Sequence, residues 1–408
     1  MGITWSGFVK FDYISDSRLT SNLREGHFEL YPLRVVKNSA GKDLNAVPSS
    51  EMLAVQSRLT GKIVGPDFMG GKTSGMLEGE FFGTSDGDIN GFRMRHAMAK
   101  VAWTKSEVMV GQYWHPMFVP ECYPGVYNFN TGVPFEPFNR SPQIRFTAKP
   151  SAKLKIIAAL AEERDFQSFG PAGTIDGSGV STTSTGGNLF QRYSALPNGH
   201  LQLQFTQKNI VGGIGADFKS LRPRIKTLNN SLTDTKVSSS AFTAYLKAGI
   251  KKLTWKVQGT YGSNMSDMVM LGGYAETSVD SARGYTYSAS KLAAVWTEFS
   301  GMLSKKVEGG LFIGYTKQLG LTDGEVKGAV YGRGLGAGSG TSIDNIVRFS
   351  GRLGLKEGKM TFGLEGEYTL AQYGTMQSDG KVKPELSDGS SLDPVGNFRI
   401  MLTGIYAF

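Results

Sequence analysis

Hydrophobic and polar residues alternate along most of the chain, which is the pattern of strands with two different faces. In residues 3–15, Trp5, Val9 and Phe11 lie on one face, opposite Lys10 and Asp12. Because successive side chains of a strand point to opposite sides, each such segment has one apolar and one polar face. The same alternation recurs in residues 52–63, 201–206, 253–264, 347–355, 361–370 and 397–408. The sequence therefore predicts an all-β protein.

The spacing of these segments predicts how the strands are connected. About sixteen segments of roughly ten residues alternate between short and long connections, the arrangement of a transmembrane antiparallel β-barrel. Examples are the short connections 149–152 and 249–252 and the long ones 16–50 and 164–197. Fourteen or eighteen strands are alternatives, because the alternation is blurred in 101–113 and 291–303. We expect one barrel domain over residues 1–408, with short periplasmic turns and long extracellular loops.

Composition changes this picture little. The 408 residues carry a net charge of +9, which favours anionic partners without choosing among them. No apolar run approaches the roughly 18 residues of a transmembrane helix. The first residues enter a strand pattern directly, without a basic segment followed by an apolar core. We expect that a signal peptide has been removed and that the barrel lies in the bacterial outer membrane, in contact with lipid and lipopolysaccharide.

Charged residues on the polar faces are the candidate pore lining. In 92–95 and 143–146, Arg or Gln occupies every second position and apolar residues occupy the others. An arginine stays charged at any relevant pH and binds carboxylate or phosphate through two N–H groups, so such strands favour anions. The predicted lining residues are Arg58, Arg93, Arg95, Gln143, Arg145, Arg348 and Arg352, with Lys62, Lys256 and Arg399 as further cations and Glu78, Glu80, Glu365 and Glu367 as their anionic counterparts.

The long connection 115–139, which we call loop 115–139, is the candidate pore-constricting segment. It contains Pro120, Pro124, Pro134 and Pro137 together with several Phe and Tyr residues. Proline restricts the backbone and aromatic rings pack with few rotatable bonds, so the loop can hold a shape. Its alternative is a cap on the outer surface. The residues expected at the constriction are His115, Glu121, Glu136, Asn139 and Arg140.

Other chemistry has little support in the sequence. The Gly71-Lys72-Thr73 triplet lacks the first glycine and the strand-to-helix context of a P-loop. The four histidines, His27, His96, His115 and His200, have no metal-ligand spacing, and Cys122 has no evident histidine partner. Basic and aromatic residues lie on opposite faces of the same strands, which disfavours nucleic-acid binding. We therefore expect no enzyme, no cofactor and no metal.

Five short motifs follow one another in the first part of the chain. They are Q-S-R-L (56–59), L-E-G-E-F-F-G (77–83), F-R-M-R-H-A (92–97), G-Q-Y-W (111–114) and R-S-P-Q-I-R-F (140–146). In order and spacing they resemble the motifs of the DcaP-like porins, which are related to the phosphate-selective and benzoate-type porins. The resemblance covers residues 50–150, and the rest agrees in rhythm only. It implies an outer-membrane barrel of about sixteen strands, commonly trimeric, that passes small anions such as dicarboxylates. Some members carry an N-terminal coiled coil, which is absent from this sequence.

Pattern and resemblance together predict a passive diffusion channel for small hydrophilic solutes, with a mild preference for anions. The alternative is a barrel without transport, acting as an adhesin or as an accessory subunit of a larger outer-membrane assembly. A barrel enzyme is a further alternative, which the lack of a Ser/His/Asp or Asp/His set near the paired carboxylates disfavours.

Overall fold

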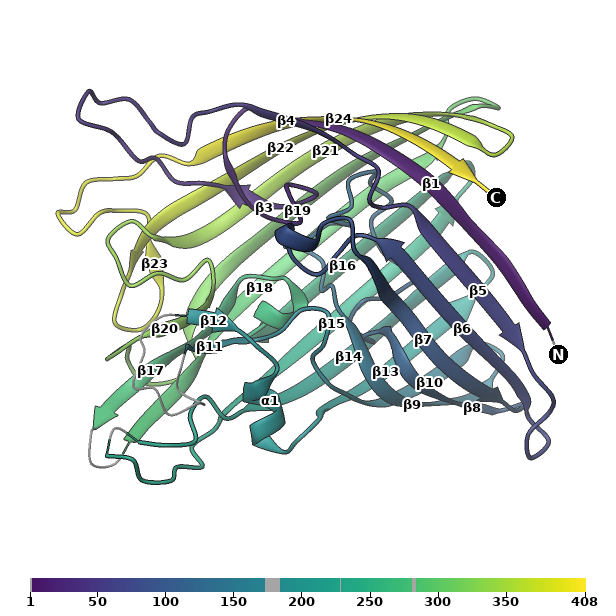
Figure 1. The fold of residues 1–408 in the computed structure, drawn as a ribbon, viewed down its shortest axis with the longest axis horizontal. Coiled ribbons are helices and arrows are strands. Elements are labelled where there is room, and N and C mark those ends of the chain that lie inside the picture. Colours follow the sequence, from purple (N-terminus) through teal and green to yellow (C-terminus); the bar gives the residue numbers. More distant parts are fainter. Residues whose placement is uncertain (1, 173–183, 228, 281–283) are drawn as a thin grey trace.

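Sixteen antiparallel strands close into a barrel in the computed structural model, which describes residues 2–172, 184–227, 229–280 and 284–408 (Figure 1). Each strand pairs with the next barrel strand along the chain, and β1 closes the ring by pairing with both β24 and β5. The barrel strands are β1 (Gly2–Asp16), β5 (Arg58–Val64), β6 (Lys72–Phe81), β7 (Phe92–Ala102), β8 (Ser106–Trp114), β9 (Arg140–Ser151), β10 (Leu154–Ala161), β13 (Asn198–Gln207), β14 (Ile210–Leu221), β15 (Val237–Ile250), β16 (Leu253–Ser263), β18 (Gly284–Met302), β19 (Val307–Leu321), β21 (Ser342–Glu357), β22 (Met360–Met376) and β24 (Val395–Ala407). The predicted fold class and strand number are confirmed.

Short turns and long loops lie at opposite ends of the barrel, as predicted. Residues 152–153, 208–209, 251–252 and 358–359 are short turns between paired strands. Both chain termini lie at the end of these turns (Figure 1). The long loops at the other end contain the remaining elements, which are β2 (Thr20–Leu23), β3 (Phe28–Pro32), β4 (Ser49–Leu53), β11 (Phe169–Pro171), β12 (Ser184–Gly186), β17 (Gly272–Asp280), β20 (Val330–Arg333), β23 (Val382–Lys383), the helix α1 (Leu189–Ser194) and two 3-10 turns, Asp86–Asp88 and Ser266–Met268.

The segment 52–63, predicted as one strand, is divided in two. Both β4 and β5 pair with β1, but residues 54–57 between them form a turn. The Ser57 N–H and hydroxyl both donate to the carbonyl of Ala54, at 3.2 and 2.8 Å. A side-chain hydroxyl that bonds the nearby backbone offers an alternative to the strand ladder. The apolar pattern continues through this interruption, so it does not reveal the turn.

The two faces of the barrel wall differ in polarity, because outward positions are apolar and inward positions are polar. On β9, Ile144 and Phe146 are 60% and 48% exposed, whereas Gln143 and Thr147 are buried. Apolar side chains on the outside of a closed barrel face lipid, because the ladder already satisfies every backbone group. In the described part of the chain, no helix is long and apolar enough to cross a membrane.

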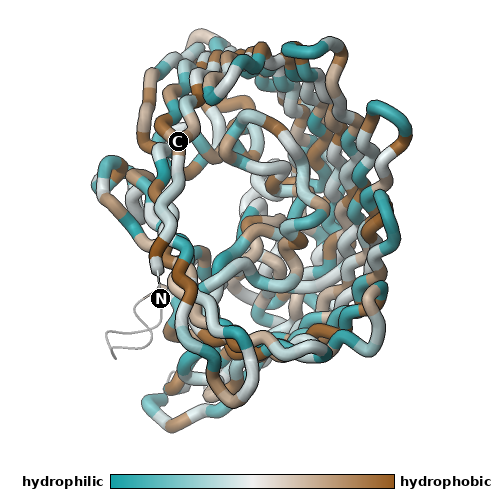
Figure 2. Tube along the Cα trace, turned by 90° about the vertical axis from the view of Figure 1, so that its right-hand side faces the viewer, coloured by the Kyte–Doolittle hydropathy of each residue, from teal (hydrophilic) through white to brown (hydrophobic). Residues whose placement is uncertain are grey.

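The interior of the ring contains chain segments from the long loops (Figure 2). Phe28 of β3 packs edge-on against Phe129 and Phe138, with ring centroids 4.9 and 5.2 Å apart, and against Phe166 at 5.5 Å. Aromatic pairs with this geometry stabilise a packed cluster beyond the area that they bury. The β2–β3 hairpin and loop 115–139 are thus packed against each other.

Candidate functional site

Loop 115–139 contacts inward side chains from several strands of the barrel wall. Near its middle, the Gly125 N–H donates to Glu298 of β18 at 2.9 Å, and the Tyr127 N–H donates to Glu365 of β22. Further along, Arg348 of β21 donates to the Val133 carbonyl at 2.6 Å. The base of the loop is closed by a hydrogen bond from His115 N to Asn139 O at 3.0 Å. The loop is therefore held by the wall from within the ring.

One group of predicted lining residues forms a buried ionic cluster, which we call the arginine cluster. It consists of Arg58, Arg93, Arg95 and Arg140 around Glu78, Glu80 and Asp165. Pairing in the β-ladder places Arg58 opposite Glu80 on the neighbouring strand. Glu80 is fully buried and accepts hydrogen bonds from Arg58 at 3.0 Å and from Arg95. These guanidinium groups are therefore paired with carboxylates of the protein itself.

Asp165 joins the arginine cluster from the long loop between β10 and β13. Its carboxylate lies 2.6 Å from Arg93 Nη1 and 2.5 Å from Arg140 Nη2. Burial by itself raises the pKa of Asp165, but Arg140 and Arg93 outweigh burial and lower the pKa to about 2. The side chain of Asp165 thus stays charged and ties its loop to the wall.

A second ionic group lies on strands β18, β21, β22 and β24. Arg352 pairs with Glu298 at 2.5 Å, and Arg348 pairs with Glu367 at 3.3 Å. Arg399 of β24 pairs with Asp16 at 2.7 Å and with Glu29 of the β2–β3 hairpin at 3.3 Å. These predicted lining residues point inward, and they hold the two inner loop segments to the wall.

Arg145 is placed differently from the other predicted arginines. It lines a cavity of ≈ 290 Å³ beside loop 115–139, together with Lys100, Lys155, Glu121 and Gln202. Its guanidinium donates to Gln143 Oε1 at 2.9 Å and to the Trp114 carbonyl at 2.6 Å. Among the residues that the structure describes, no carboxylate lies within 4.0 Å of it. Arg145 is thus a half-buried cation at a cavity without an anionic partner.

The remaining predicted residues have diverse roles. Gln143 donates to the carbonyls of Tyr113 and Trp114, both at 3.0 Å. Asn139 donates to the Asp267 carbonyl at 2.8 Å, which binds the end of loop 115–139 to a neighbouring loop. Glu136 is fully buried, accepts the indole N–H of Trp296, and has its pKa raised well above the ordinary value by burial. Glu121 lines the cavity, 3.8 Å from Lys155. Lys62 is exposed near a short turn.

Several charged residues at these sites were not predicted from the sequence. Asp165 and Asp267 lie in long loops, where no alternation indicates direction, and Glu298 lies in the segment 291–303 with blurred alternation. Asp217 of β14 follows the alternation, since it is buried between exposed neighbours such as Phe218, and its position in the strand would have indicated an inward side chain. The contacts of the loop residues required the folded chain.

Comparison with solved structures identifies the fold. The structure is similar to the outer membrane channel DcaP of Acinetobacter baumannii, with a TM-score of 0.67 and 13% identity over 100% of this chain and 97% of that chain. The chain has the DcaP fold. An anion-selective porin from Comamonas acidovorans matches with a TM-score of 0.54 and 10% identity, covering 100% of this chain and 99% of that chain. The trimer form of OmpT from Vibrio cholerae has a TM-score of 0.55 at 10% identity, with coverage of 100% and 99%.

No protein-family profile matches the sequence, and a search of curated proteins finds no match. The likeness to DcaP is therefore one of fold. The predicted resemblance is confirmed at this level, and with it the architecture of a bacterial outer-membrane barrel. The apolar outer face of the wall agrees with that location.

Proposed function

We propose that the protein is an outer-membrane porin, a passive diffusion channel for small hydrophilic solutes with a mild preference for anions such as dicarboxylates. Support for a channel comes from the fold shared with DcaP and with the anion-selective porin of Comamonas acidovorans. Loop 115–139 is the constricting element in this proposal, because it connects β8 and β9, lies inside the ring and is bound to side chains of the distant strands β18 and β21. The oligomer that we propose is a homotrimer, by analogy with the trimer form of OmpT.

The main support for an anion preference is Arg145, whose guanidinium lies at the cavity beside loop 115–139 and donates to oxygens that carry no charge. The cavity also contains Lys100 and Lys155 against Glu107 and Glu121, so cations outnumber anions by three to two. A weak, partly hydrated positive site attracts an anion without holding it tightly, which permits passage. The buried arginine cluster contributes less in this proposal, because each of its four guanidinium groups is paired with one or more of its three carboxylates.

The test is the reversal potential in planar bilayers under a KCl gradient. We expect Cl⁻ to be favoured over K⁺ in the wild type, and Arg145→Gln to lower the Cl⁻/K⁺ permeability ratio by at least about twofold, because a cation at the pore is lost. Lys381→Gln is the matched control, since it removes the same charge from an exposed loop residue paired only with Asp379. A wild-type preference for K⁺, or an equal effect of both substitutions, would contradict the proposal.

A second candidate function is a barrel without transport, an adhesin or accessory subunit. It is favoured by one observation, the aromatic cluster of Phe28, Phe129, Phe138 and Phe166 inside the ring, which reduces the open cross-section. Single-channel recording separates the two, because a closed barrel shows no conductance steps. Swelling of liposomes in succinate and in a neutral sugar of similar size then measures whether an open barrel prefers the acid.

A further inference from the structure

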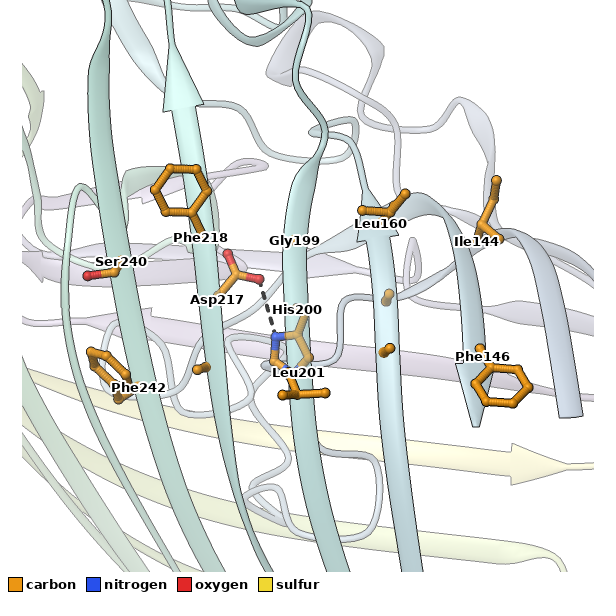
Figure 3. A pocket seen from close by; sticks show the side chains of 13 residues that line it. Ile144, Phe146, Leu160, Gly199, His200, Leu201, Asp217, Phe218, Ser240 and Phe242 are labelled. Atoms are coloured by element: carbon orange, nitrogen blue, oxygen red, sulfur yellow. Dashed lines mark hydrogen bonds and ion pairs between the residues drawn. The ribbon is translucent and has the colours of Figure 1, made fainter. Parts of the chain in front are cut away.

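Two histidines and one aspartate meet inside the barrel, where loop 115–139 begins. His115 is the first residue of this loop, His200 lies on β13, and Asp217 lies directly opposite His200 on β14. All three are buried, and one ligand atom from each lies within 4.8 Å of the others. Figure 3 shows the His200 ring turned toward the Asp217 carboxylate, with the interaction drawn between the two strands. We propose that these residues form a binding site for a divalent transition metal such as Zn²⁺.

The distances from both histidines to Asp217 fit a metal. His200 Nδ1 is 3.2 Å and His115 Nε2 is 3.5 Å from the same oxygen of Asp217. Two ligands that bind a tetrahedral Zn²⁺ at about 2.1 Å each stand roughly 3.4 Å apart. Two imidazoles and one carboxylate also form a donor set that suits Zn²⁺ and other transition metals rather than Ca²⁺ or Mg²⁺. A fourth position would remain for water or another ligand.

His115 provides an independent observation that a ligand is missing from this network. Its ring is fully buried, and among the described residues Nε2 has no hydrogen-bond partner, although it lies 3.5 Å from the Asp217 carboxylate. A buried polar atom without a partner is costly, and such atoms commonly bind water or an ion. The other ring nitrogen, Nδ1, faces the Met117 N–H at 3.3 Å. When Nε2 binds a metal, the ring proton lies on Nδ1 and faces the Met117 N–H. Metal binding would therefore break the contact between Met117 and Nδ1.

The hydrogen bonds of His200 leave its Nδ1 directed at an acceptor. The carboxylate of Glu121 accepts from the amide of Gln204, whose oxygen accepts from the Tyr245 hydroxyl at 3.0 Å. The Tyr245 oxygen in turn accepts from the amide of Gln202 at 2.7 Å. Because the Glu121 carboxylate can only accept, it fixes which group donates in every hydrogen bond of this series. The Gln202 oxygen therefore faces His200 Nε2, at 3.2 Å.

His200 therefore donates its Nε2–H to Gln202, and its Nδ1 meets the Asp217 carboxylate at 3.2 Å. Two acceptors at this distance repel unless a proton or a cation lies between them. A metal-bound histidine commonly has this arrangement, in which the second ring nitrogen donates to an oxygen that orients the ring. The series of hydrogen bonds from His200 through Gln202, Tyr245 and Gln204 supplies that orientation.

The surrounding charges leave Asp217 available for a cation. Lys219, on the same strand, is 2.5 Å from Asp267 and 3.6 Å from Glu163. In the described ranges, the only basic side chains within 4.0 Å of Asp217 are the two histidines. The cavity lined by Glu121, Gln202 and Arg145 borders the hydrogen-bonded series that ends at His200. A metal here would link the start of loop 115–139 to strands β13 and β14.

The test measures metal binding by the intact barrel in detergent micelles, without a transport assay. Metal-free protein is titrated with Zn²⁺ by calorimetry and with Co²⁺ by its visible absorption, which reports a tetrahedral site. Metal is offered both to the folded barrel and during refolding. We expect one Zn²⁺ per chain in the wild type and a loss of affinity of roughly 100-fold or more in His115→Gln, His200→Gln and Asp217→Asn.

His27→Gln is the matched control, because His27 also contacts an aspartate, Asp12, at 3.3 Å but has no second histidine beside it. We expect this variant to bind Zn²⁺ as the wild type does. Each variant is first shown to be folded by heat-modifiable migration on a gel. Absence of binding by both loading routes, or equal binding by all variants, would overturn the metal site and leave a proton as the link between His200 and Asp217. Binding without conductance would support the site and separate it from the proposed channel.

Discussion

At the scale of single residues, the role of a charged side chain inside the barrel depends on the groups that it contacts. Arg93 and Arg145 belong to strands with the same alternation, yet Arg93 lies against Glu80 and Asp165, while Arg145 donates to a carbonyl and an amide oxygen and meets no carboxylate of the described residues. A guanidinium that is compensated by carboxylates is a structural element, because its charge is cancelled locally. A guanidinium without a carboxylate retains its field at the cavity. The first holds loops in place, and the second is the one that we propose attracts solutes.

Asp165 provides a prediction about stability and pH. Asp165→Asn leaves Arg93 and Arg140 buried with one counter-charge fewer, and we expect it to lower the free energy of unfolding by about 2–5 kcal/mol at neutral pH. The measurement is denaturant unfolding of the barrel in lipid vesicles. Glu162→Gln is the control, since Glu162 lies nearby in the chain but is exposed.

The pH dependence of the same interaction has a definite sign. Because the pKa of Asp165 falls from 3.8 to about 2 in the folded protein, its contribution to stability is complete above about pH 4. That contribution is lost as the pH falls through about 2. The difference in unfolding free energy between wild type and Asp165→Asn should therefore shrink between pH 4 and pH 2. A difference that stays constant over this interval would mean that Asp165 stabilises the barrel in another way.

At the scale of elements, loop 115–139 depends on close packing against the wall. Gly314 of β19 faces Phe135, and a Cβ atom at this position would lie 2.4 Å from Phe135 Cγ. Phe135 is fully buried in the cluster that includes Trp296 and Phe312, so its ring cannot move aside easily. Glycine at 314 is thus required by the approach of the loop rather than by the strand.

Gly314→Ala tests this packing. We expect a loss of about 1–3 kcal/mol in unfolding free energy from overpacking. We also expect increased cleavage of loop 115–139 by added protease, because the ring of Phe135 is displaced. Gly351→Ala is the matched control, since a Cβ there would meet Leu311 at an ordinary 3.5 Å. Equal protease sensitivity of the two variants would show that the contact at Gly314 does not hold the loop.

At the scale of the whole molecule, the closed ring divides the chain between lipid and interior. The ends of the chain meet in this ring, since Phe408 N donates to Gly7 O at 3.1 Å and Gly7 N donates to Phe408 O at 3.3 Å. Closure removes the free edges that an open sheet would present to lipid. The exposed apolar side chains then form the outer surface of one body.

Substitution of lipid-facing isoleucines tests where the membrane lies. Ile313 is exposed near the middle of β19, whereas Ile250 is exposed at the end of β15, beside a short turn. We expect Ile313→Arg to lower the free energy of unfolding in vesicles by about 2–4 kcal/mol and Ile250→Arg by about 0–1 kcal/mol, because the cost of a charge depends on depth. Equal costs at the two positions would contradict the placement of the hydrocarbon layer across the middle of the barrel.

The sequence by itself determined the class of the fold. Alternation specifies which side chains of a strand share a face, and it specifies this locally, so it correctly predicted the barrel and its strand number. Arg93, Arg95, Arg348 and Arg352 are buried on the polar faces of their strands. Residues 154–161 contain good helix formers, yet they form the strand β10. The turn at 54–57 was missed because a side-chain hydrogen bond, and not hydrophobicity, interrupts the strand.

Only the tertiary structure decided which charged groups are compensated and which are free. Arg93 meets Asp165 across 72 positions of the sequence, and Gly125 meets Glu298 across 173. Such contacts depend on where the long loops fold inside the ring, and loop sequences have no periodicity that specifies direction. The same holds for His115, whose approach to His200 and Asp217 brings together three residues that have no recognisable spacing in the chain. Local sequence therefore specifies the wall, whereas long-range packing specifies the chemistry inside it.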